Sequence, residues 1–376
     1  MPKQSSDIFN PVGPAIPFSK SGQKWKIDKD VNVGSAGSAI FSAFTDSTLV
    51  NKGHVYSYNL YGAFFTKNNA TLINKETGLI NGPFGVVFDP DVLTDVKGSV
   101  ENHGNIVGYL AGIYNSELGD FTVKNYGDIY GYEDGIYSNA SNAGSTAGPV
   151  IKNFNSITSD EHGVSVGAND PSLRSKVVNQ KDGVIEGGKI EEGGAAVYNP
   201  TGKIILINKG TIKGDVDVRN TENDTITNTG KINGTVILGA GNDKLDNRDG
   251  KVTGYIFGLE GKDKLIAGDA KEKFVFLGVL DGTTNVDRVK KFESGKDKFL
   301  LDKGSFPDLD TGPLAKAAFR KDIAAQDADD RIVYDETTGG LYYDDDGFGG
   351  DPQVLFARLD AGQKLKYSDF RVEFFE

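Results

Sequence analysis

The 376-residue chain contains no cysteine, which excludes disulfide bridges and cysteine–metal sites. Only three histidines are present, and this disfavours a histidine-rich metal site. No apolar run approaches the ~20 residues that a membrane-spanning helix needs, so we expect no transmembrane segment. The first 22 residues have no apolar stretch after a basic start, and they therefore predict no cleaved Sec signal peptide.

Basic residues are also fewer than acidic ones, at 41 Lys and Arg against 53 Asp and Glu, which gives a formal net charge of −12. Because phosphate backbones need a basic surface, nucleic acid is disfavoured as a partner. A chain of this charge favours cations as partners instead. Glycine is abundant at 49 residues, nearly twice its usual share of ~7%.

An asparagine-centred repeat fills the first two-thirds of the chain. Apolar stretches, an asparagine and a turn rich in glycine or asparagine recur at intervals of 19 to 29 residues. The segment NHGNIVGYLAGIYN (102–115) aligns without gaps with NYGDIYGYEDGIYS (125–138). The anchors of the repeat are Asn51, Asn74, Asn102, Asn125, Asn153, Asn179, Asn208, Asn228 and Asn247.

A repeat of this length cannot bury a core alone, whereas stacked copies can. The apolar stretches are rich in β-formers and show no helical periodicity, and glycine and asparagine tolerate the conformations of sharp turns. The sequence therefore predicts an all-β fold, a parallel β-helix (β-solenoid) with one coil per repeat. Stacked asparagines would hydrogen-bond along the axis as an amide ladder. Two tyrosine pairs, 109/132 and 114/137, would then stack in adjacent coils, either covering the face or binding sugar.

A second pattern, built on aspartate, lies between residues 220 and 276. Asp224, Asp243 and Asp263 are spaced by 19 and 20 residues, which is one coil each. The last two follow glycine turns, LGAGNDKLD (238–246) and GLEGKDKLI (258–266), and a degenerate copy, AGDAKEKFVF (267–276), comes next.

Calcium prefers six to eight oxygen ligands, and two such turns stacked one coil apart can enclose an ion between carbonyls and carboxylates. The alternative is that these aspartates only terminate turns. Asp224 lacks the glycines that precede the other two aspartates. The predicted calcium ligands are Asp243, Asp263, Gly239, Gly241, Gly258, Glu260 and Asp224.

These motifs resemble the repeats-in-toxin (RTX, hemolysin-type) calcium-binding nonapeptide G-G-x-G-x-D-x-U-x, in which U is a large apolar residue. The copies are imperfect, since Leu238 and Leu259 each replace a glycine. The segments 274–306, 339–359 and 367–376 are similar to the region that follows such repeats. The resemblance covers about residues 220–376. It implies calcium as cofactor, a type I exporter that reads a C-terminal signal, and a secreted or surface-bound product of a Gram-negative bacterium.

A further calcium candidate is the loop DDDGFGGD (344–351), in which Asp344, Asp346 and Asp351 offer carboxylates. A solvated acidic turn is the equal alternative there. Asp287 and Asp297 are interpreted as turn residues of strands that close the solenoid, and they are the weaker calcium candidates. The predicted domains are an N-terminal extension (1–24), a β-helix of degenerate repeats (25–237), RTX-type calcium-binding repeats of β-roll type (238–276), and a C-terminal capping and secretion-signal region (277–376).

We assign no catalytic residue from the sequence. FDPD (88–91), His54, His103 and His162 all lie in turn-like contexts. The chain has no HExxH and no GxSxG motif, which excludes a metalloprotease and disfavours a lipase.

The sequence predicts a secreted calcium-binding β-helix protein that acts as a surface, matrix or adhesion component, with polysaccharide or a cell surface as a partner. A polysaccharide-active enzyme remains open, and it predicts a groove with clustered Asp, His and Tyr between residues 74 and 199. A bacteriocin-like toxin also remains open, although the chain lacks the long apolar N-terminal region of pore-forming toxins.

Overall fold

The computed structural model describes residues 1–89, 97–140 and 145–375. Strands make up 49% of the structure and helices 2%, and the chain forms about 12 turns of β-solenoid, so the predicted fold class is confirmed. The chain divides into two compact units, Met1–Val218 and Arg219–Glu376. No helix in the described ranges is long and apolar enough to cross a membrane.

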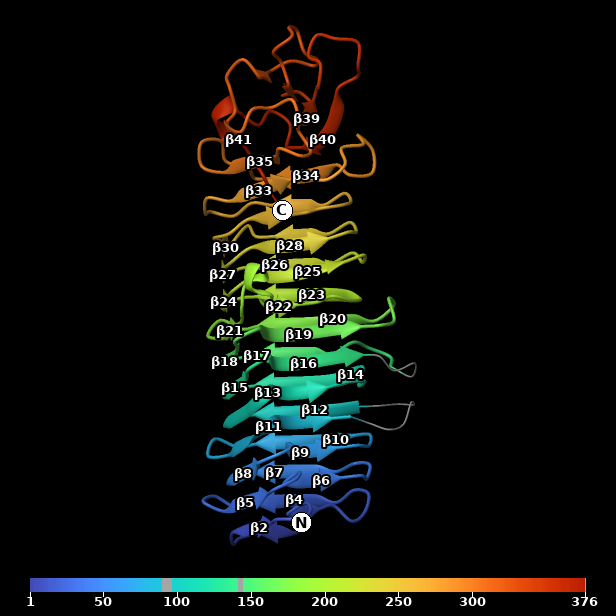
Figure 1. The fold of residues 1–376 in the computed structure, drawn as a ribbon, viewed down its shortest axis with the longest axis vertical. Coiled ribbons are helices and arrows are strands. Elements are labelled where there is room, and N and C mark those ends of the chain that lie inside the picture. The colour runs from blue at the N-terminus through green and yellow to red at the C-terminus, as the bar shows by residue number, and fades with distance from the viewer. Residues whose placement is uncertain (90–96, 141–144, 376) are drawn as a thin grey trace. The chain divides into compact units, whose positions relative to one another are not determined.

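The first unit is built from three parallel ladders, to which most turns add one strand each (Figure 1). The first ladder comprises β1 (Lys3–Gln4), β4 (Lys24–Ile27), β7 (Thr48–Asn51), β10 (Ala70–Asn74), β12 (Lys97–Asn102), β14 (Asp120–Asn125), β17 (Val150–Asn153), β20 (Arg174–Asn179) and β23 (Lys203–Asn208). The second ladder comprises β2 (Ile8–Asn10), β5 (Asn32–Ser35), β8 (His54–Ser57), β15 (Asp128–Gly131), β18 (Ser156–Ser159), β21 (Val184–Glu186) and β24 (Thr211–Lys213).

The third ladder comprises β3 (Ile16–Pro17), β6 (Ile40–Ser42), β9 (Tyr61–Phe65), β16 (Asp134–Ala140), β19 (His162–Ala168), β22 (Ala195–Tyr198) and β25 (Val216–Asn220). Two long strands, β11 (Leu79–Phe88) and β13 (Asn105–Asn115), run through both the second and the third ladder. A short 3-10 helix, η1 (Ile190–Glu192), lies between β21 and β22. The segment 1–24, which the sequence analysis treats as an extension, contains β1, β2 and β3.

The core of the first unit consists of apolar side chains stacked in register from turn to turn. Alternate residues of a strand point inward, so one apolar residue per turn at a fixed position gives a continuous column. The predicted alignment of 102–115 with 125–138 is confirmed, because Ile106 lies opposite Ile129 and Tyr114 opposite Tyr137. One such column of fully buried residues is Ile80, Ile106, Ile129, Ile157, Ile185 and Ile212.

The predicted amide ladder is confirmed at the corner between the first and second ladders. Each asparagine Nδ2 donates to the Oδ1 of the asparagine one turn on, over distances of 2.8–3.0 Å. The same Nδ2 groups also donate to turn carbonyls, as Asn125 does to Ser156 at 2.8 Å. In the first unit the ladder consists of the fully buried residues Asn51, Asn74, Asn102, Asn125, Asn153, Asn179 and Asn208. In the second unit the predicted anchors Asn228 and Asn247 are also fully buried, and Asn228 Nδ2 donates to Asn247 Oδ1 at 2.7 Å.

The second unit is also built from parallel ladders, and the length and number of its strands change along the chain. Its first ladder comprises β26 (Thr225–Asn228), β29 (Lys244–Asp246), β32 (Lys264–Ile266), β34 (Asp287–Lys290) and β40 (Val354–Arg358). Its second ladder, within the described residues, pairs β27 (Lys231–Asn233) with β30 (Lys251–Val252). Its third ladder comprises β28 (Val236–Gly239), β31 (Ile256–Phe257), β33 (Lys273–Phe276), β35 (Lys298–Asp302) and β41 (Phe370–Glu373).

The C-terminal part of this unit covers the last turn with short, mostly antiparallel strands. β41 packs against β35 and buries Phe370 and Val372. The covering elements are β36 (Gly312–Pro313), β37 (Phe319–Arg320), β38 (Ile332–Asp335), β39 (Gly340–Tyr343) and the 3-10 helix η2 (Tyr367–Asp369). Such a cover removes the unpaired edge that a solenoid end would otherwise expose.

Candidate metal centre

Four buried aspartates, which we call the aspartate column, lie one above another in the second unit, each at the start of a first-ladder strand. The amide of Asp224 donates to Asp243 Oδ1 at 2.6 Å, and the amide of Asp243 donates to Asp263 Oδ1 at 2.8 Å. The amide of Asp263 in turn donates to Asp287 Oδ1 at 3.0 Å. All four residues are at most 4% exposed. The column therefore contains the three predicted aspartates and one more.

Local sequence explains how each turn presents its aspartate. Each aspartate comes two residues before a buried apolar residue, which anchors the strand in the core, as Leu245 does after Asp243. The preceding turn needs left-handed backbone, with φ of 111° at Gly239 and 138° at Gly241. Leu259, which aligns with Gly239 in the next turn, has a φ of 72°, a conformation that costs a non-glycine residue about 1–2 kcal/mol.

Gly258 is required for a different reason. A Cβ at this position would lie 2.4 Å from Asp263 Oδ2 and 2.9 Å from Asp287 Oδ2. Two carboxylate oxygens, one from this turn and one from the next, therefore converge on the bare backbone of Gly258. This places the Oδ2 atoms of Asp263 and Asp287 beside one point of the backbone.

The column has more negative charge than its hydrogen bonds satisfy. Asp243 Oδ2 and Asp263 Oδ2 are buried and have no hydrogen-bond partner. Burial raises the pKa of Asp243 to about 8. Burial first, and then the neighbouring Asp287 carboxylate, raise the pKa of Asp263. A carboxylate can only accept hydrogen bonds, so such a column needs protons or cations to neutralise it.

The predicted backbone ligands lie beside the aspartates. Gly239 N donates to Gly258 O at 3.2 Å, and Gly241 N donates to Glu260 O at 3.0 Å, so the two glycine turns stack directly. A hollow of about 490 Å³ borders these turns and includes Lys262 on its rim. The structure therefore brings together all seven residues predicted from the repeats.

Asp287 is the member of the column that the sequence indicates as a turn residue and only as a weaker calcium candidate. It lies 24 residues after Asp263 rather than 19 or 20, because the turn before it is longer. The signal was nevertheless present, since Asp287 comes two residues before the buried Val289. The position of an aspartate two residues before a core residue therefore identifies a member of the column better than its spacing from the previous aspartate does.

A second group of carboxyls lies at the other corner, and we call it the carboxyl pair, Glu272 and Asp297. Glu272 Oε1 accepts from Asn247 Nδ2 at 3.1 Å, and Asp297 Oδ1 accepts from the Glu272 amide at 3.1 Å. Both are at most 1% exposed, and burial raises the pKa of each. The degenerate copy 267–276 thus leads into β33 of the third ladder and contributes to a different corner from the aspartate column.

The acidic loop 344–351 brings Asp344, Asp345 and Asp346 together, with one oxygen from each within 4.8 Å of the others. Asp344 Oδ1 accepts from Gly347 N at 2.8 Å, and Asp346 Oδ2 accepts from Gly350 N at 2.8 Å. Asp351 contributes its amide to Asp346 at 3.2 Å. These contacts organise the loop as a turn, and they leave calcium binding there a prediction.

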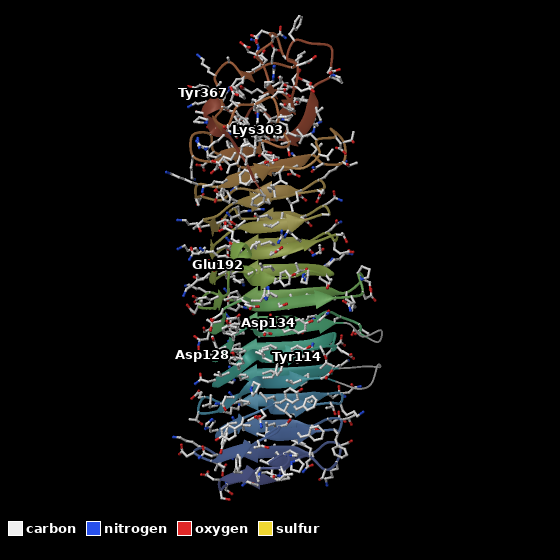
Figure 2. The ribbon with its side chains drawn as sticks, viewed as in Figure 1. Tyr114, Asp128, Asp134, Glu192, Lys303 and Tyr367 are labelled. Atoms are coloured by element: carbon white, nitrogen blue, oxygen red, sulfur yellow. The ribbon has the colours of Figure 1, made fainter. Side chains whose placement is uncertain are left out.

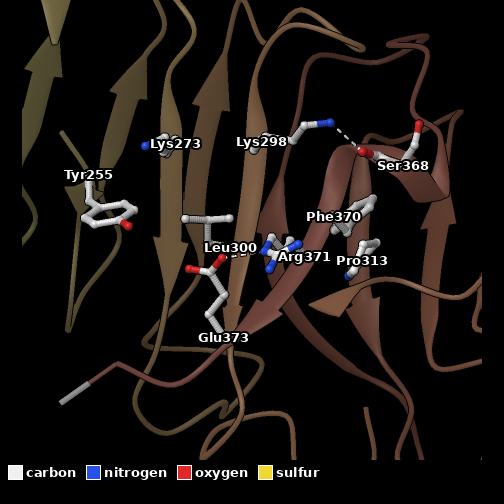
Figure 3. A pocket seen from close by; sticks show the side chains of 9 residues that line it. All are labelled: Tyr255, Lys273, Lys298, Leu300, Pro313, Ser368, Phe370, Arg371 and Glu373. Atoms are coloured by element: carbon white, nitrogen blue, oxygen red, sulfur yellow. Dashed lines mark hydrogen bonds and ion pairs between the residues drawn. The ribbon is translucent and has the colours of Figure 1, made fainter. Parts of the chain in front are cut away.

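Another hollow of the second unit is basic and aromatic (Figure 3). It measures about 270 Å³ and is lined by Tyr255 and by residues of β33, β35, β36, η2 and β41. Lys273 Nζ lies 4.8 Å from the centre of the Tyr255 ring, and the Lys298 ammonium donates to the Ser368 carbonyl. Its cations make it unsuitable for a metal ion.

The first unit places an aspartate and a histidine together on its third ladder. Asp134 Oδ1 lies 3.7 Å from His162 Nδ1 and has no hydrogen-bond partner. Burial, followed by Glu133 and Glu161, raises the pKa of Asp134 to about 7. The His162 ring stacks on Tyr198 with centroids 4.6 Å apart.

The two predicted tyrosine pairs are stacked in the first unit. The rings of Tyr109 and Tyr132 lie 5.8 Å apart at an angle of 7°, and those of Tyr114 and Tyr137 lie 4.9 Å apart at 12°. Figure 2 labels Tyr114, which belongs to the ladder that carries Asp134. Within each pair the ring faces are turned toward each other.

Of the FDPD segment, Asp89 Oδ1 accepts from Ser116 Oγ at 2.8 Å. Pro90 and Asp91 of that segment lie outside the described residues.

Comparisons with known proteins give no family for this chain. No protein-family model matches it, and no curated protein matches it. The resemblance to RTX repeats therefore rests on the sequence motifs alone.

Proposed function

We propose that the aspartate column binds calcium ions and that this protein is a secreted, calcium-dependent β-solenoid acting as a surface, matrix or adhesion component. The observation that carries the calcium proposal is the pair of buried, unpartnered oxygens, Asp243 Oδ2 and Asp263 Oδ2. An ion between adjacent turns would give each of them a ligand role. It would also remove the repulsion between carboxylates stacked one turn apart.

The donor set favours calcium over other ions. Carboxylate and carbonyl oxygens are hard ligands, which suit calcium and magnesium but not zinc or copper. Magnesium keeps several waters in a strict octahedron, whereas calcium accepts the larger and less regular oxygen sets that stacked turns provide. Because unfolded turns hold no site, the free energy of ion binding becomes free energy of folding.

Secretion and the surface role rest on the resemblance of residues 220–376 to RTX proteins. A chain that completes its second unit only with calcium would stay unfolded in a cytosol poor in the free ion. The strand β41 in the predicted export segment 367–376 pairs with β35. In an unfolded chain this strand is undocked and open to an exporter. Deleting residues 367–376 should abolish export through a type I system, and normal export of the deletion variant would contradict this role.

Isothermal titration with calcium tests the ion site directly. Asp243→Asn and Asp263→Asn keep side-chain shape and remove one charge each. If both ligate one ion, each substitution should lower affinity by a similar factor, and the double variant should lose little more. Asp249→Asn is the matched control, because Asp249 is exposed on the next turn segment. Unchanged calcium affinity in the double variant would contradict the proposed site.

A second candidate function is catalysis on a polysaccharide, favoured by the Asp134–His162 pair with its neighbouring tyrosines. A carboxyl whose pKa is raised to about 7 can exchange a proton near neutral pH, and clustered Asp, His and Tyr are what this function predicts. The hollows described above are lined by other residues. Product release from a panel of acidic polysaccharides should stop in Asp134→Asn and continue in Asp128→Asn, and turnover unaffected by Asp134→Asn would exclude this role for the pair.

A further inference from the structure

A basic and aromatic surface follows the asparagine ladder of the first unit. The residue after each ladder asparagine lies beside its counterparts, because the asparagines themselves are in register. This surface, which we call the lysine–aromatic stripe, follows the first five ladder asparagines and comprises in order Lys52, Lys75, His103, Tyr126 and Phe154, before Gln180 and Lys209 follow the last two. All five residues are at least partly exposed. The stripe is therefore available to a ligand that runs along the unit.

The basic half of the stripe borders a hollow of about 420 Å³, which also includes Lys29, Glu76 and Thr77. Lys29 and Lys52 form no ion pair with any residue in the described ranges, and Lys75 Nζ lies 3.7 Å from Glu101 Oε1. Lysines one turn apart are separated by about 4.8 Å and repel one another. The result is a positive site on a chain whose net charge is −12.

The aromatic half of the stripe begins where the lysines end. The rings of His103 and Tyr126 are 4.8 Å apart at 12°, and those of Tyr126 and Phe154 are 4.4 Å apart at 17°. His103 also lines the hollow, so the first ring of the stack borders the space between the lysines. Its Nε2 lies 2.8 Å from Glu101 Oε1, which fixes the ring.

We propose that the lysine–aromatic stripe binds a linear acidic polysaccharide laid along the first unit. Anionic groups of successive sugars would pair with Lys29, Lys52 and Lys75, and the apolar faces or edges of the following sugars would contact His103 and Tyr126. One lysine per turn matches a polymer with one charge per sugar. It matches duplex DNA poorly, because DNA carries one charge per ~1.7 Å. This inference does not depend on the calcium proposal.

Titration calorimetry of the full chain with a galacturonate hexamer tests the inference. The matched neutral ligand is the fully methyl-esterified hexamer, which has the same rings and no charge. All titrations use one fixed, saturating calcium concentration, so that the second unit is the same throughout. We expect binding of the acidic hexamer that weakens as salt is added, and no binding of the ester.

Variants locate the site. Lys52→Glu combined with Lys75→Glu should weaken binding of the acidic hexamer by roughly tenfold or more, because each reversal replaces attraction by repulsion. Tyr126→Ala should weaken it by a smaller factor. Lys20→Glu, at an exposed lysine away from the stripe, should leave it unchanged. If the double glutamate variant does not fold, the double glutamine variant carries the test.

Three results would overturn the inference. Equal affinity for the acidic hexamer and its ester would mean that charge does not select the ligand. Equal losses in the stripe variant and in Lys20→Glu would place binding elsewhere. Tighter binding of a short DNA duplex of equal total charge would show a general polyanion surface rather than a polysaccharide site.

Discussion

In the first unit one corner of successive turns is filled by an asparagine, from Asn51 to Asn208. The second unit has two such asparagines, Asn228 and Asn247, and fills a further corner with carboxylates. Both side chains accept a hydrogen bond from the neighbouring turn, as Asn125 Oδ1 does from Asn102 and Asp243 Oδ1 does from the Asp224 amide. Only asparagine can also donate, and Asn125 Nδ2 reaches Asn153 Oδ1 at 2.9 Å. An amide column therefore satisfies itself, while a carboxylate column leaves oxygens without partners.

This difference predicts that the first unit is stable by itself and that the stability of the second unit depends on the solution. The neutral ladder of the first unit needs nothing from solution. The aspartate column of the second unit needs cations or protons, because several buried carboxylates lie one turn apart. We therefore expect the folding of the second unit, and not that of the first, to depend on the ions and the pH of the solution.

The largest expected effect comes from converting the first kind of corner into the second. Asn125→Asp removes the donor to Asn153 and Ser156 and places a carboxyl among fully buried groups. We expect a loss of about 4 kcal/mol in the free energy of unfolding, as for other unpaired buried charges. Urea denaturation measures it. Asn169→Asp, at an exposed site, should cost less than ~0.5 kcal/mol, and a comparable loss there would show that position on the ladder is irrelevant.

Calcium removal should affect the two units differently. At a calcium concentration 100-fold above Kd, each bound ion adds about 2.7 kcal/mol of stability. Chelation should therefore increase hydrogen exchange across residues 239–300, measured by mass spectrometry, and leave residues 49–208 almost unchanged. Equal increases in both ranges, or none in either, would remove the proposed distinction between the units.

The single carboxyl of Asp134 tests a buried charge within the first unit. Its pKa is raised to about 7 in the folded protein, so the proton is held more tightly than in the unfolded chain. This group therefore stabilises the fold fully below pH ~4, and its contribution is lost as the pH rises to ~7. Burial lowers the pKa of the neighbouring His162 below its usual value.

Thermal unfolding from pH 5 to pH 7 measures this linkage. Asp134→Asn cannot ionise, so it should gain about 2 kcal/mol relative to the wild-type chain over that interval. Asp128→Asn, at an exposed carboxylate of β15, serves as the control. Parallel pH profiles for wild type and Asp134→Asn would show that the carboxyl does not titrate in this interval.

A small gain in stability at Leu259 distinguishes the sequence motif from the backbone geometry. Leu238 and Leu259 both occupy positions at which the calcium-binding nonapeptide has glycine. Only Leu259 has left-handed backbone, with a φ of 72°. We expect Leu259→Gly to raise stability in calcium by about 1 kcal/mol. Leu238→Gly should instead lose roughly 3 kcal/mol, because Leu238 is 1% exposed in β28. Changes of the same sign in both melting temperatures would contradict this assignment.

Sequence determined the repeated parts of this protein. Asparagine at Asn51 to Asn208 and the apolar residues around it recur once per turn, so periodicity alone gives the solenoid, the register and the amide ladder. The same reasoning reached Asp243 and Asp263, because their glycine turns have the period of the coil. The shared period also explains why the two glycine turns come together, since stacked copies of one motif occupy the same corner.

Only the tertiary structure decided what the irregular turns do. Asp287 joins the aspartate column across a longer loop, Glu272 and Asp297 meet at another corner, and Asp134 meets His162 on the third ladder. Insertions change the number of residues between such groups without changing the strand on which each lies. Sequence spacing measures distance along the chain, whereas contact depends on which turn stacks on which. The ladder hydrogen bonds fix that stacking, and they form only in the folded solenoid.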